Sequence, residues 1–289
     1  MKKILITGGS GQLAKQLFLE LRDLFSVISC DRNDLNITDR ENVKSFLTNY
    51  NPDIIINTAA YTDVDGCEVD SDLAYDVNAF SINNFSDFFN GLFIQISTDY
   101  VFDGENGPYD ESDKTNPLST YGKSKLKGEE MVEKNFTNYL IIRTNVLYGG
   151  KSKASFLDWV IASLSSKKEI HIVNDQFNNP VSIYDLSSIL KDLITKKKRG
   201  LFHIGSKNIY SRFDFANMIA KTWGLNNDYI LPISTKELKK RLNNYVAERP
   251  MKSGLISLDK AIPEFSLVDS LEKIKNLKVF SSLIFLIYC

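Results

Sequence analysis

A tyrosine and a lysine four residues apart form the pair in this chain best suited to chemistry. Tyr121 and Lys125 lie in the segment YGKSK, downstream of Ser97 and Thr98, which end an apolar run. On a helix this spacing places both side chains on one face, so a phenol and an ammonium reach the same small volume. The arrangement suits proton transfer, although an exposed helix turn explains the pair alone equally well.

A glycine-rich turn near the N-terminus predicts a dinucleotide site. The short β-type run from Lys3 to Thr7 leads into GGSGQLA, Gly8 to Ala14, and leucines then recur at helical spacing. Small residues at Gly8 and Gly11 let the backbone approach a pyrophosphate, which the N-terminus of the following helix would face. A glycine turn that binds nothing is the alternative.

The next expected strand, Ser26 to Cys30, is followed by Asp31 and Arg32. An acidic residue here can accept hydrogen bonds from an adenosine ribose and so favours NADH, whereas an arginine favours the 2′-phosphate of NADPH. An ordinary loop aspartate is a third explanation. The sequence therefore predicts NADPH or NADH without choosing between them.

Strands and helices alternate along the first half of the chain. Helices are expected over Thr38 to Asn49 and Ala74 to Asn90, and further strands over Pro52 to Asn57, Phe93 to Ile96 and Tyr139 to Asn145. This alternation is typical of an α/β protein with a Rossmann-type, doubly wound parallel sheet. Ligands bind such sheets at the carboxyl ends of the strands, where Ser97 and Thr98 would lie.

The pattern loosens after Gly150. Helices are expected over Ser155 to Ser166, Tyr184 to Thr195 and Phe213 to Trp223, with short strands at Ile170 to Val173 and Leu201 to Ile204. We expect residues 1–150 to form the dinucleotide-binding domain. Residues 151–289 would form a smaller, mainly substrate-binding C-terminal lobe, with some segments returning to the first domain.

Composition excludes several classes of protein. The 289 residues carry 35 basic and 36 acidic side chains, a balance that offers no broad electrostatic surface for a nucleic-acid polymer. The three cysteines form no C-x-x-C motif, so neither a metal site nor a disulfide framework is predicted, and a cytoplasmic location fits.

The two ends of the chain give no sign of export or of membrane insertion. The N-terminal apolar run is too short for a signal peptide. The apolar tail from Val279 to Cys289 is too short to span a membrane. We expect the tail to be a docked terminal segment, while an altered reading frame or an oligomer contact, such as a homodimer interface, is also open.

Taken together, the motifs resemble the dTDP-4-dehydrorhamnose reductase family of the extended short-chain dehydrogenase/reductase superfamily. They are TGGSGQLA, NTAAYTDVD, STDYVFDG, NPLSTYGKSKLKGE, DQFNNP and ERP. The resemblance implies hydride transfer from NADPH or NADH to the 4-keto carbon of a dTDP-4-keto-6-deoxy sugar, without a metal. The β subunit of methionine adenosyltransferase shares this signature, so a regulatory subunit is a second hypothesis. A nucleotide-sugar epimerase or dehydratase is a third.

The resemblance also implies roles for individual residues. Tyr121 would protonate the substrate oxygen, Thr98 would hydrogen-bond the same oxygen, and Lys125 would lower the pKa of Tyr121 and reach the nicotinamide ribose. The expected cofactor-binding residues are Gly8, Gly11, Gln12, Leu13, Asp31, Arg32, Ala59, Ala60, Tyr61, Asn78, Tyr121 and Lys125. The expected substrate-binding residues are Thr98, Asp99, Val101, Tyr121, Asn179 and Arg249.

Two departures from the family pattern affect ligand choice. Asn36 stands in LNIT, where the family commonly has LDIT, so the adenine contact is expected to differ. Arg212 stands between Ser211 and Phe213, where the reductases often carry tryptophan. Neither change touches Tyr121 or Lys125, so the resemblance implies the reaction class more firmly than the sugar.

Overall fold

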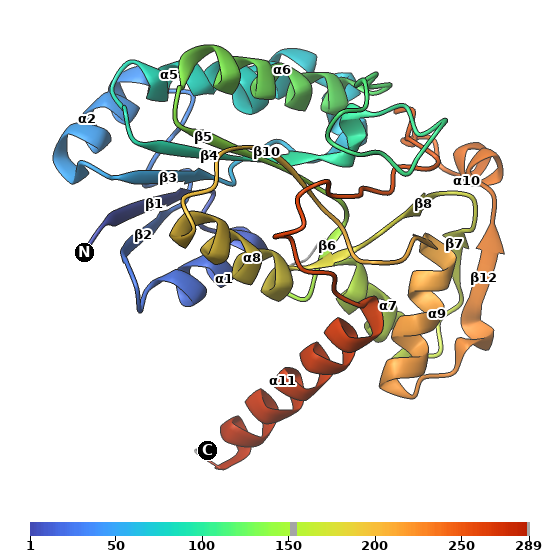
Figure 1. Cartoon of the computed structure of the whole chain (residues 1–289). Coiled ribbons are helices and arrows are strands. Elements are labelled where there is room, and N and C mark those ends of the chain that lie inside the picture. The colour runs from blue at the N-terminus through green and yellow to red at the C-terminus, as the bar shows by residue number, and fades with distance from the viewer. Residues whose placement is uncertain (151–154, 288–289) are drawn as a thin grey trace.

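A six-stranded parallel sheet forms the centre of the computed structural model, which describes residues 1–150 and 155–287. The strand order is β10-β5-β4-β3-β1-β2, and every neighbouring pair is parallel. The predicted Rossmann-type α/β fold is confirmed (Figure 1). The strands are β1 (Lys3–Thr7), β2 (Ser26–Cys30), β3 (Ile54–Asn57), β4 (Leu92–Thr98), β5 (Tyr139–Thr144) and β10 (Gly200–Ile204).

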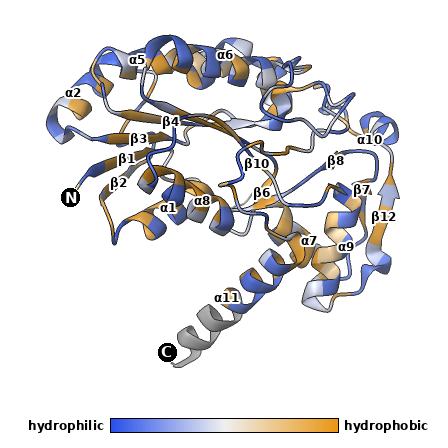
Figure 2. Cartoon of the chain, viewed as in Figure 1, coloured by the Kyte–Doolittle hydropathy of each residue, from blue (hydrophilic) through white to orange (hydrophobic). Residues whose placement is uncertain are grey.

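Helices cover both faces of the sheet, because its strands are apolar on both sides. Successive residues of β1 show this directly: Ile4 and Ile6 pack into one hydrophobic cluster, whereas Leu5 packs into the other. Figure 2 shows hydrophobic residues along the central strands. The first cluster includes α1 (Gln12–Leu21) and α8 (Ile183–Thr195), and the second includes α2 (Arg40–Tyr50), α5 (Ser81–Ser86) and α6 (Thr120–Asn135).

A row of polar side chains interrupts the apolar core near the carboxyl ends of three strands. Thr7 Oγ1 donates to Asn57 Oδ1 at 2.6 Å, and Asn57 Nδ2 donates to Gln95 Oε1 at 2.8 Å. Gln95 Nε2 then donates to the Ile96 carbonyl at 3.2 Å. All three side chains are buried and paired, as buried polar groups must be to avoid a desolvation cost. The row runs from Thr7, the last residue of β1 before the glycine turn, to the interior of β4.

The connection from β3 to β4 departs from the single helix expected over Ala74 to Asn90. It contains α3 (Val64–Val69), α4 (Ser71–Tyr75), a π-helical turn (Asp76–Phe80) and α5. Such π-helical turns are rare and often lie at functional sites. This one buries Asn78, whose contacts are described below.

The C-terminal part builds small sheets and also contributes to the main one. β10 and α8 belong to the large sheet and its helical layer, although they lie beyond residue 150. The smaller elements are a 3₁₀ turn (Asn227–Tyr229), α7 (Phe156–Ser165), α9 (Arg212–Trp223), α10 (Thr235–Arg241) and the pairs β6 (Leu147–Tyr148) with β9 (Val181–Ser182), β7 (Ile170–Val173) with β12 (Ile230–Ile233) and β8 (Phe177–Asn178) with β11 (Tyr210–Ser211).

The last helix, α11 (Leu267–Ile287), packs against the body of the molecule at its start. Leu267, Leu271 and Ile274 are almost completely buried in the cluster formed with α7 and α9. Figure 1 shows the rest of the helix running away from the body of the molecule. The prediction of a docked tail concerns Val279 to Cys289, whose side chains lie outside the described residues, so it stays a prediction. Across the described residues, no helix combines the length and apolarity needed to cross a membrane.

Candidate active site

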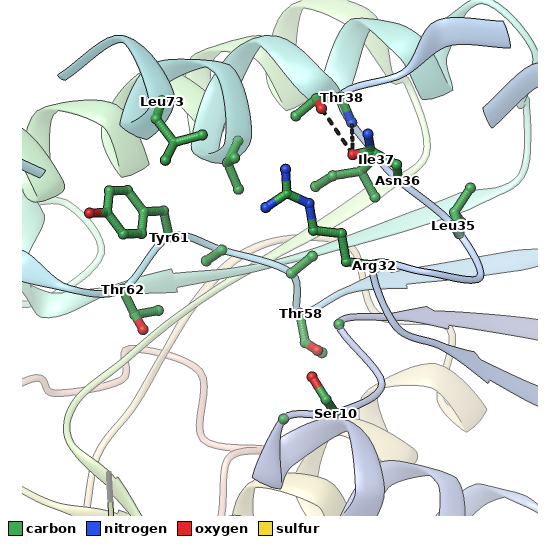
Figure 3. Close-up of a pocket in the computed structure, with 15 residues that line it drawn as sticks. Ser10, Arg32, Leu35, Asn36, Ile37, Thr38, Thr58, Tyr61, Thr62 and Leu73 are labelled. Carbon is green, nitrogen blue, oxygen red and sulfur yellow. Dashed lines mark hydrogen bonds between the residues drawn. The ribbon is translucent and has the colours of Figure 1, made fainter. Parts of the chain in front are cut away.

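A pocket of about 360 Å³ opens at the carboxyl ends of β1, β2 and β3 (Figure 3). The loop after each of these strands contributes to its wall, as expected for a ligand site of a doubly wound sheet. The residues that line it are Gly8, Ser10, Gly11, Arg32, Leu35, Asn36, Ile37, Thr38, Thr58, Ala59, Ala60, Tyr61, Thr62, Leu73 and Val77. Of the predicted cofactor-binding residues, Gly8, Gly11, Arg32, Ala59, Ala60 and Tyr61 thus meet here.

The glycine turn has the backbone geometry that an anion-binding turn requires. Gly8 has φ of 69°, and a Cβ there would come within 2.9 Å of the Ala59 backbone. Gly11 is the N-cap of α1 and offers no side-chain cap, whereas Asp39 caps α2 and Ser119 caps α6. The first N–H groups of α1 are therefore free of side-chain capping and suit a phosphate. The residues present fit the pyrophosphate of a dinucleotide.

Gln12 and Leu13 direct their side chains away from the pocket. Gln12 Nε2 donates to the Leu147 carbonyl and Gln12 Oε1 accepts from the Gly150 amide, both at 3.3 Å. Leu13 is buried in the core against the sheet. The predicted cofactor contacts of these two residues are therefore restricted to their backbone amides.

The side chains of Asp31 and Arg32, which predict different cofactors, lie in different places. Asp31 Oδ1 accepts from the Asn33 amide at 2.8 Å and so stabilises its own loop, and Asp31 does not line the pocket. The guanidinium of Arg32 points into the pocket instead (Figure 3). Within the described chain Arg32 has no ion pair. The predicted ribose contact from Asp31 is not supported, and a cation stands in its place.

The segment Leu35 to Thr38 forms one wall of the pocket, and the sequence did not predict this wall as a unit. Asn36 lines the pocket, and its Oδ1 accepts from both the amide and the hydroxyl of Thr38. Among the described residues its Nδ2 has no hydrogen-bond partner, so it is available to a base. The sequence pointed to Asn36 alone, because LNIT differs from the family's LDIT at that residue.

Asn78 joins the pocket to the helix that carries the catalytic candidates. Its Oδ1 accepts from the Tyr61 amide at 2.8 Å, and its Nδ2 donates to the Tyr61 carbonyl at 3.1 Å and to Ser124 Oγ at 2.9 Å. At Gly128 a Cβ would lie 2.3 Å from the Asn78 carbonyl oxygen, so the glycine lets α6 approach closely. Asn78 supports the site through Tyr61 and Ser124.

Thr98 and Tyr121 are brought together as predicted. Thr98 ends β4, and Tyr121 lies in the first turn of α6, which Ser119 caps through the Gly122 amide. The Thr98 hydroxyl lies close enough to the Tyr121 phenol for a hydrogen bond between them to affect the pKa of the phenol. Burial raises the pKa of Tyr121 well above its ordinary value, and this hydrogen bond offsets the rise only in part.

Lys125 is buried and directed toward the sheet. Its Nζ donates to the Ile96 carbonyl at 2.6 Å, next to the end of the polar row. Burial lowers the pKa of Lys125 to about 8, and the negative charge of Glu129 opposes this change. The expectation that Lys125 brings the pKa of Tyr121 below its ordinary value is therefore wrong: that pKa is raised.

Two predicted substrate ligands have structural contacts that limit their availability. Asn179 Nδ2 donates to the carbonyls of Ser206 and Leu255, at 2.8 and 2.7 Å, and its Oδ1 accepts from the Leu255 amide. Val101 lies in a buried apolar cluster with Phe102. Asn179 thus joins two loops, and Val101 has only its backbone to offer a substrate.

Asp99 is buried beside Thr98, where it accepts hydrogen bonds from Thr98 Oγ1 at 3.1 Å and from Ser253 Oγ. Burial raises the pKa of Asp99, and these hydrogen bonds oppose the rise. The carboxyl is therefore engaged with its neighbours. This geometry favours a role in orienting Thr98 over the role of an additional acid that a dehydratase needs.

A buried ion pair behind Lys125 was missed in the sequence. Glu129 follows Lys125 by one helical turn, and it pairs with Arg143 of β5 at 2.7 Å while accepting a hydrogen bond from Ser97. Arg143 also contacts the His203 ring on β10 at 3.3 Å. The only sequence signal was the four-residue spacing between Lys125 and Glu129. The partners come from three strands that are distant in sequence.

Arg249 also lies in a polar network. Its guanidinium pairs with Asp65 of α3 and stacks on the Tyr245 ring at 3.8 Å. The Arg212 guanidinium lies 5.7 Å from the Phe156 ring.

In residues 1–150 and 155–287, no cluster of side chains could hold a metal ion.

Comparison with known proteins decides the family. A family model described as the RmlD substrate binding domain matches residues 1–267. The chain belongs to the dTDP-4-dehydrorhamnose reductase family. The resemblance carried by the motifs is thereby confirmed, and with it the predicted class of enzyme, an oxidoreductase.

The matches with related proteins cover most of this chain and most of each relative. It is 35% identical over 242 residues to the spore coat polysaccharide biosynthesis protein SpsK of Bacillus subtilis, covering 82% of this chain and 84% of SpsK. It is 33% identical over 228 residues to the dTDP-4-dehydrorhamnose reductase of Aggregatibacter actinomycetemcomitans, covering 75% and 77%. The crystal structure of dTDP-4-dehydrorhamnose reductase from Bacillus anthracis in complex with NADP matches with a TM-score of 0.88 at 33% identity, covering 94% and 98%.

Proposed function

We propose that this family member reduces the 4-keto group of a dTDP-4-keto-6-deoxy sugar, such as dTDP-4-dehydrorhamnose, with NADPH or NADH. The observation that carries the proposal is that Thr98, at the end of β4, and Tyr121, in the first turn of α6, lie close together. Asn78 ties this pair's helix to a pocket that fits a dinucleotide. Proton donor and cofactor site thus share one edge of the sheet.

The residues of the chain supply the proton and hold the carbonyl. The cofactor, when bound, supplies the hydride that adds to the 4-keto carbon. Tyr121 donates its phenolic proton to the carbonyl oxygen, so hydride and proton together give an alcohol. The phenol carries its proton near neutral pH, but burial raises its pKa and makes it a weaker acid, so proton transfer depends on groups that stabilise the phenolate. Thr98 turns its single hydroxyl proton from Asp99 to the same oxygen, and Lys125 binds the nicotinamide ribose and stabilises the phenolate left behind.

Arg32 should favour NADPH over NADH. Its guanidinium faces the pocket and suits a 2′-phosphate, to which a charged hydrogen bond contributes about 1.5–3 kcal/mol. We expect Arg32→Ala to weaken NADPH binding about 10- to 100-fold and to leave NADH binding unchanged. Titration calorimetry with both cofactors measures this. Arg22→Ala, an exposed arginine at the end of α1, is the matched control, and equal losses for both cofactors would contradict the role.

Cofactor binding should weaken as the pH rises through about 8. Lys125 has a pKa of about 8, so its charge is present below that pH and is lost above it. The phosphates of the cofactor are fully ionised throughout this range, so the change reports the lysine. We expect NADP⁺ affinity measured at a series of pH values to fall with this midpoint, and Lys125→Met to bind weakly without a midpoint near 8. A wild-type profile that stays flat across this range would remove Lys125 from the ribose contact.

The decisive experiment supplies purified protein with NADPH or NADH and a dTDP-4-keto-6-deoxy sugar, and follows nicotinamide absorbance. Oxidation of the cofactor with formation of the 4-hydroxy sugar is expected. If the protein binds the cofactor but does not oxidise it in the presence of any 4-keto nucleotide sugar, the regulatory hypothesis replaces the reductase hypothesis. We further propose a cytoplasmic location, which the buried free thiols of Cys30 and Cys67 support, and the same preparation tests for a homodimer by sedimentation.

A further inference from the structure

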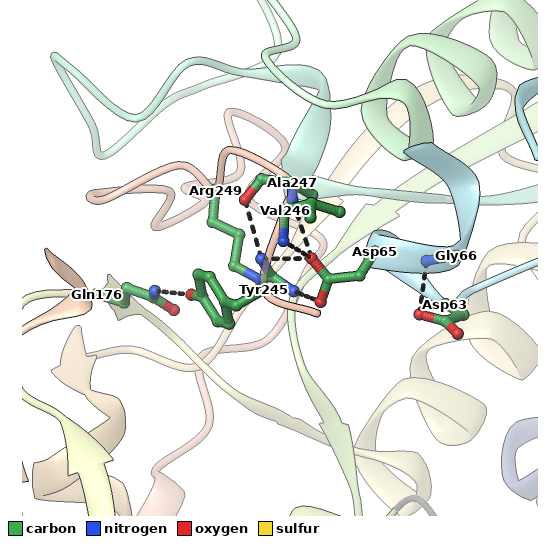
Figure 4. A network of polar contacts seen from close by, with 8 residues as sticks. All are labelled: Asp63, Asp65, Gly66, Gln176, Tyr245, Val246, Ala247 and Arg249. Carbon is green, nitrogen blue, oxygen red and sulfur yellow. Dashed lines mark hydrogen bonds and ion pairs between the residues drawn. The ribbon is translucent and has the colours of Figure 1, made fainter. Parts of the chain in front are cut away.

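One carboxylate of the cofactor half holds the segment Tyr245 to Arg249. Asp65 Oδ1 accepts from the backbone amides of Val246 and Ala247, both at 2.9 Å (Figure 4). The same carboxylate pairs with the Arg249 guanidinium through Nη1 at 3.2 Å and Nη2 at 2.5 Å. A single side chain thus fixes both the backbone and the charged group of this segment.

The contacts of Arg249 leave one edge of its guanidinium unused. An arginine offers five N–H donors in a planar fork. Asp65 takes one proton from each Nη atom, and the Ala247 carbonyl takes the second Nη1 proton at 3.0 Å. Nε and the second Nη2 proton have no hydrogen-bond partner in the part of the chain that the structure describes. These two donors are adjacent and can grip an oxyanion.

Neighbouring groups hold this edge in a fixed orientation beside the catalytic pair. The Tyr245 ring covers one face of the guanidinium at 3.8 Å, and Gln176 Nε2 donates to the Tyr245 hydroxyl at 2.7 Å. Burial raises the pKa of Tyr100, and the positive charges of Arg212 and Arg249 oppose this rise. Tyr100 in turn packs edge-on against Tyr121, with ring centroids 5.5 Å apart. The charge of Arg249 therefore acts on Tyr100, a direct neighbour of the proton donor.

Asp65 is also close in sequence to a residue that lines the cofactor pocket. It lies in the first turn of α3, three residues after Thr62, which lines that pocket. Its side chain is 23% exposed, and the paired Arg249 side chain is 12% exposed. Hydrogen bonds from two amides and from the guanidinium lower the pKa of Asp65 despite its partial burial, so it is ionised near neutral pH. An ionised, four-donor acceptor is a strong anchor for an arginine.

We propose that Asp65 is a positioning residue for the nucleotide sugar: it holds one edge of the Arg249 guanidinium so that Nε and Nη2 face the substrate's diphosphate. This inference rests on the proposed function. A planar fork recognises two phosphate oxygens only when its orientation is fixed. Without the Asp65 carboxylate, the guanidinium can rotate about its side-chain bonds, and binding of the diphosphate weakens.

The test compares Asp65→Asn with wild type in the full chain. Asparagine keeps an oxygen for the Val246 and Ala247 amides, but its NH₂ group replaces the oxygen that pairs with Arg249 Nη2. We expect dTDP binding to weaken about 10-fold, with thymidine binding unchanged, KM for the nucleotide sugar raised and kcat within about twofold. Calorimetry for dTDP and an NMR titration for thymidine provide the two affinities. Glu248→Gln, which removes an adjacent carboxylate paired with Lys239, is the matched control and should behave as wild type.

Other outcomes would overturn the inference in recognisable ways. Wild-type dTDP affinity in Asp65→Asn would show that Asp65 does not position the diphosphate contact. Equal losses for dTDP and thymidine would show a general structural role. Absence of turnover by wild-type protein with every 4-keto nucleotide sugar overturns the proposed function instead, and the comparison of dTDP with thymidine still decides the role of Asp65. Failure of wild-type protein to bind dTDP at all would overturn both.

Discussion

Replacing Tyr121 with phenylalanine should lower kcat by about 10²- to 10⁴-fold, the usual contribution of a positioned general acid. The substitution removes only the hydroxyl that lies close to Thr98 and leaves the ring packed against Tyr100. No other phenol is hydrogen-bonded to Thr98 in the described structure, so the carbonyl oxygen would lose its proton donor. Single-turnover reduction of the 4-keto sugar measures the loss directly.

Cofactor binding separates this catalytic effect from misfolding. Tyr121→Phe should bind NADPH with nearly wild-type affinity, because the pocket residues Gly8, Arg32 and Tyr61 are untouched. Tyr139→Phe, at the start of β5 and away from the site, is the matched control and should retain full turnover. Turnover by Tyr121→Phe within about threefold of wild type would remove Tyr121 as the acid.

The sequence predicts those parts of the fold that depend on neighbouring residues. In β3 three isoleucines are followed by Asn57, and all four residues are buried, which is typical of a strand covered on both faces. Gly8 and Gly11 are readable because their spacing reports a backbone conformation. Thr98 and Tyr121 come together because a parallel sheet brings the carboxyl ends of its strands to one edge.

The direction of a side chain is harder to predict than its position along the chain. Asp31 and Arg32 are adjacent, yet the first stabilises its own loop while the second faces the pocket. Asn179 occupies the motif expected for a substrate ligand, yet its amide is fully engaged with two loops. In both cases the competing partner is a backbone group, which no residue pattern reveals.

Sequence patterns do not predict contacts between segments that are far apart in the chain. Asp65 and Arg249 are 184 residues apart, and their pairing depends on how the C-terminal segment crosses the cofactor half. The shift in the pKa of Tyr121 was predicted in the wrong direction for a related reason. Its sign is set by burial under segments that are remote in sequence, and burial outweighs the hydrogen bond from Thr98.

Replacing Arg143 with leucine should destabilise the protein by about 3–5 kcal/mol, because it leaves a buried carboxylate without its cation. Glu129 and Arg143 have side chains only 4% and 7% exposed, and they are joined through Nε and Nη2. Arg143 also lies over the Phe102 ring at 5.3 Å. Urea denaturation of the full chain measures the loss. A change below about 1 kcal/mol would place the pair among weakly contributing ion pairs.

The double variant Glu129→Leu with Arg143→Leu tests the cause of that loss. Since neither charge is then buried, we expect much of the stability to return, because apolar replacements of buried ion pairs are often neutral or stabilising. Glu129 also raises the pKa of Lys125, one helical turn away. Its removal should move the midpoint of pH-dependent cofactor binding below the wild-type value of about 8. Restored stability with an unchanged midpoint would show that Glu129 contributes to folding without acting on Lys125, whereas a lower midpoint assigns the buried pair a part in keeping the lysine charged.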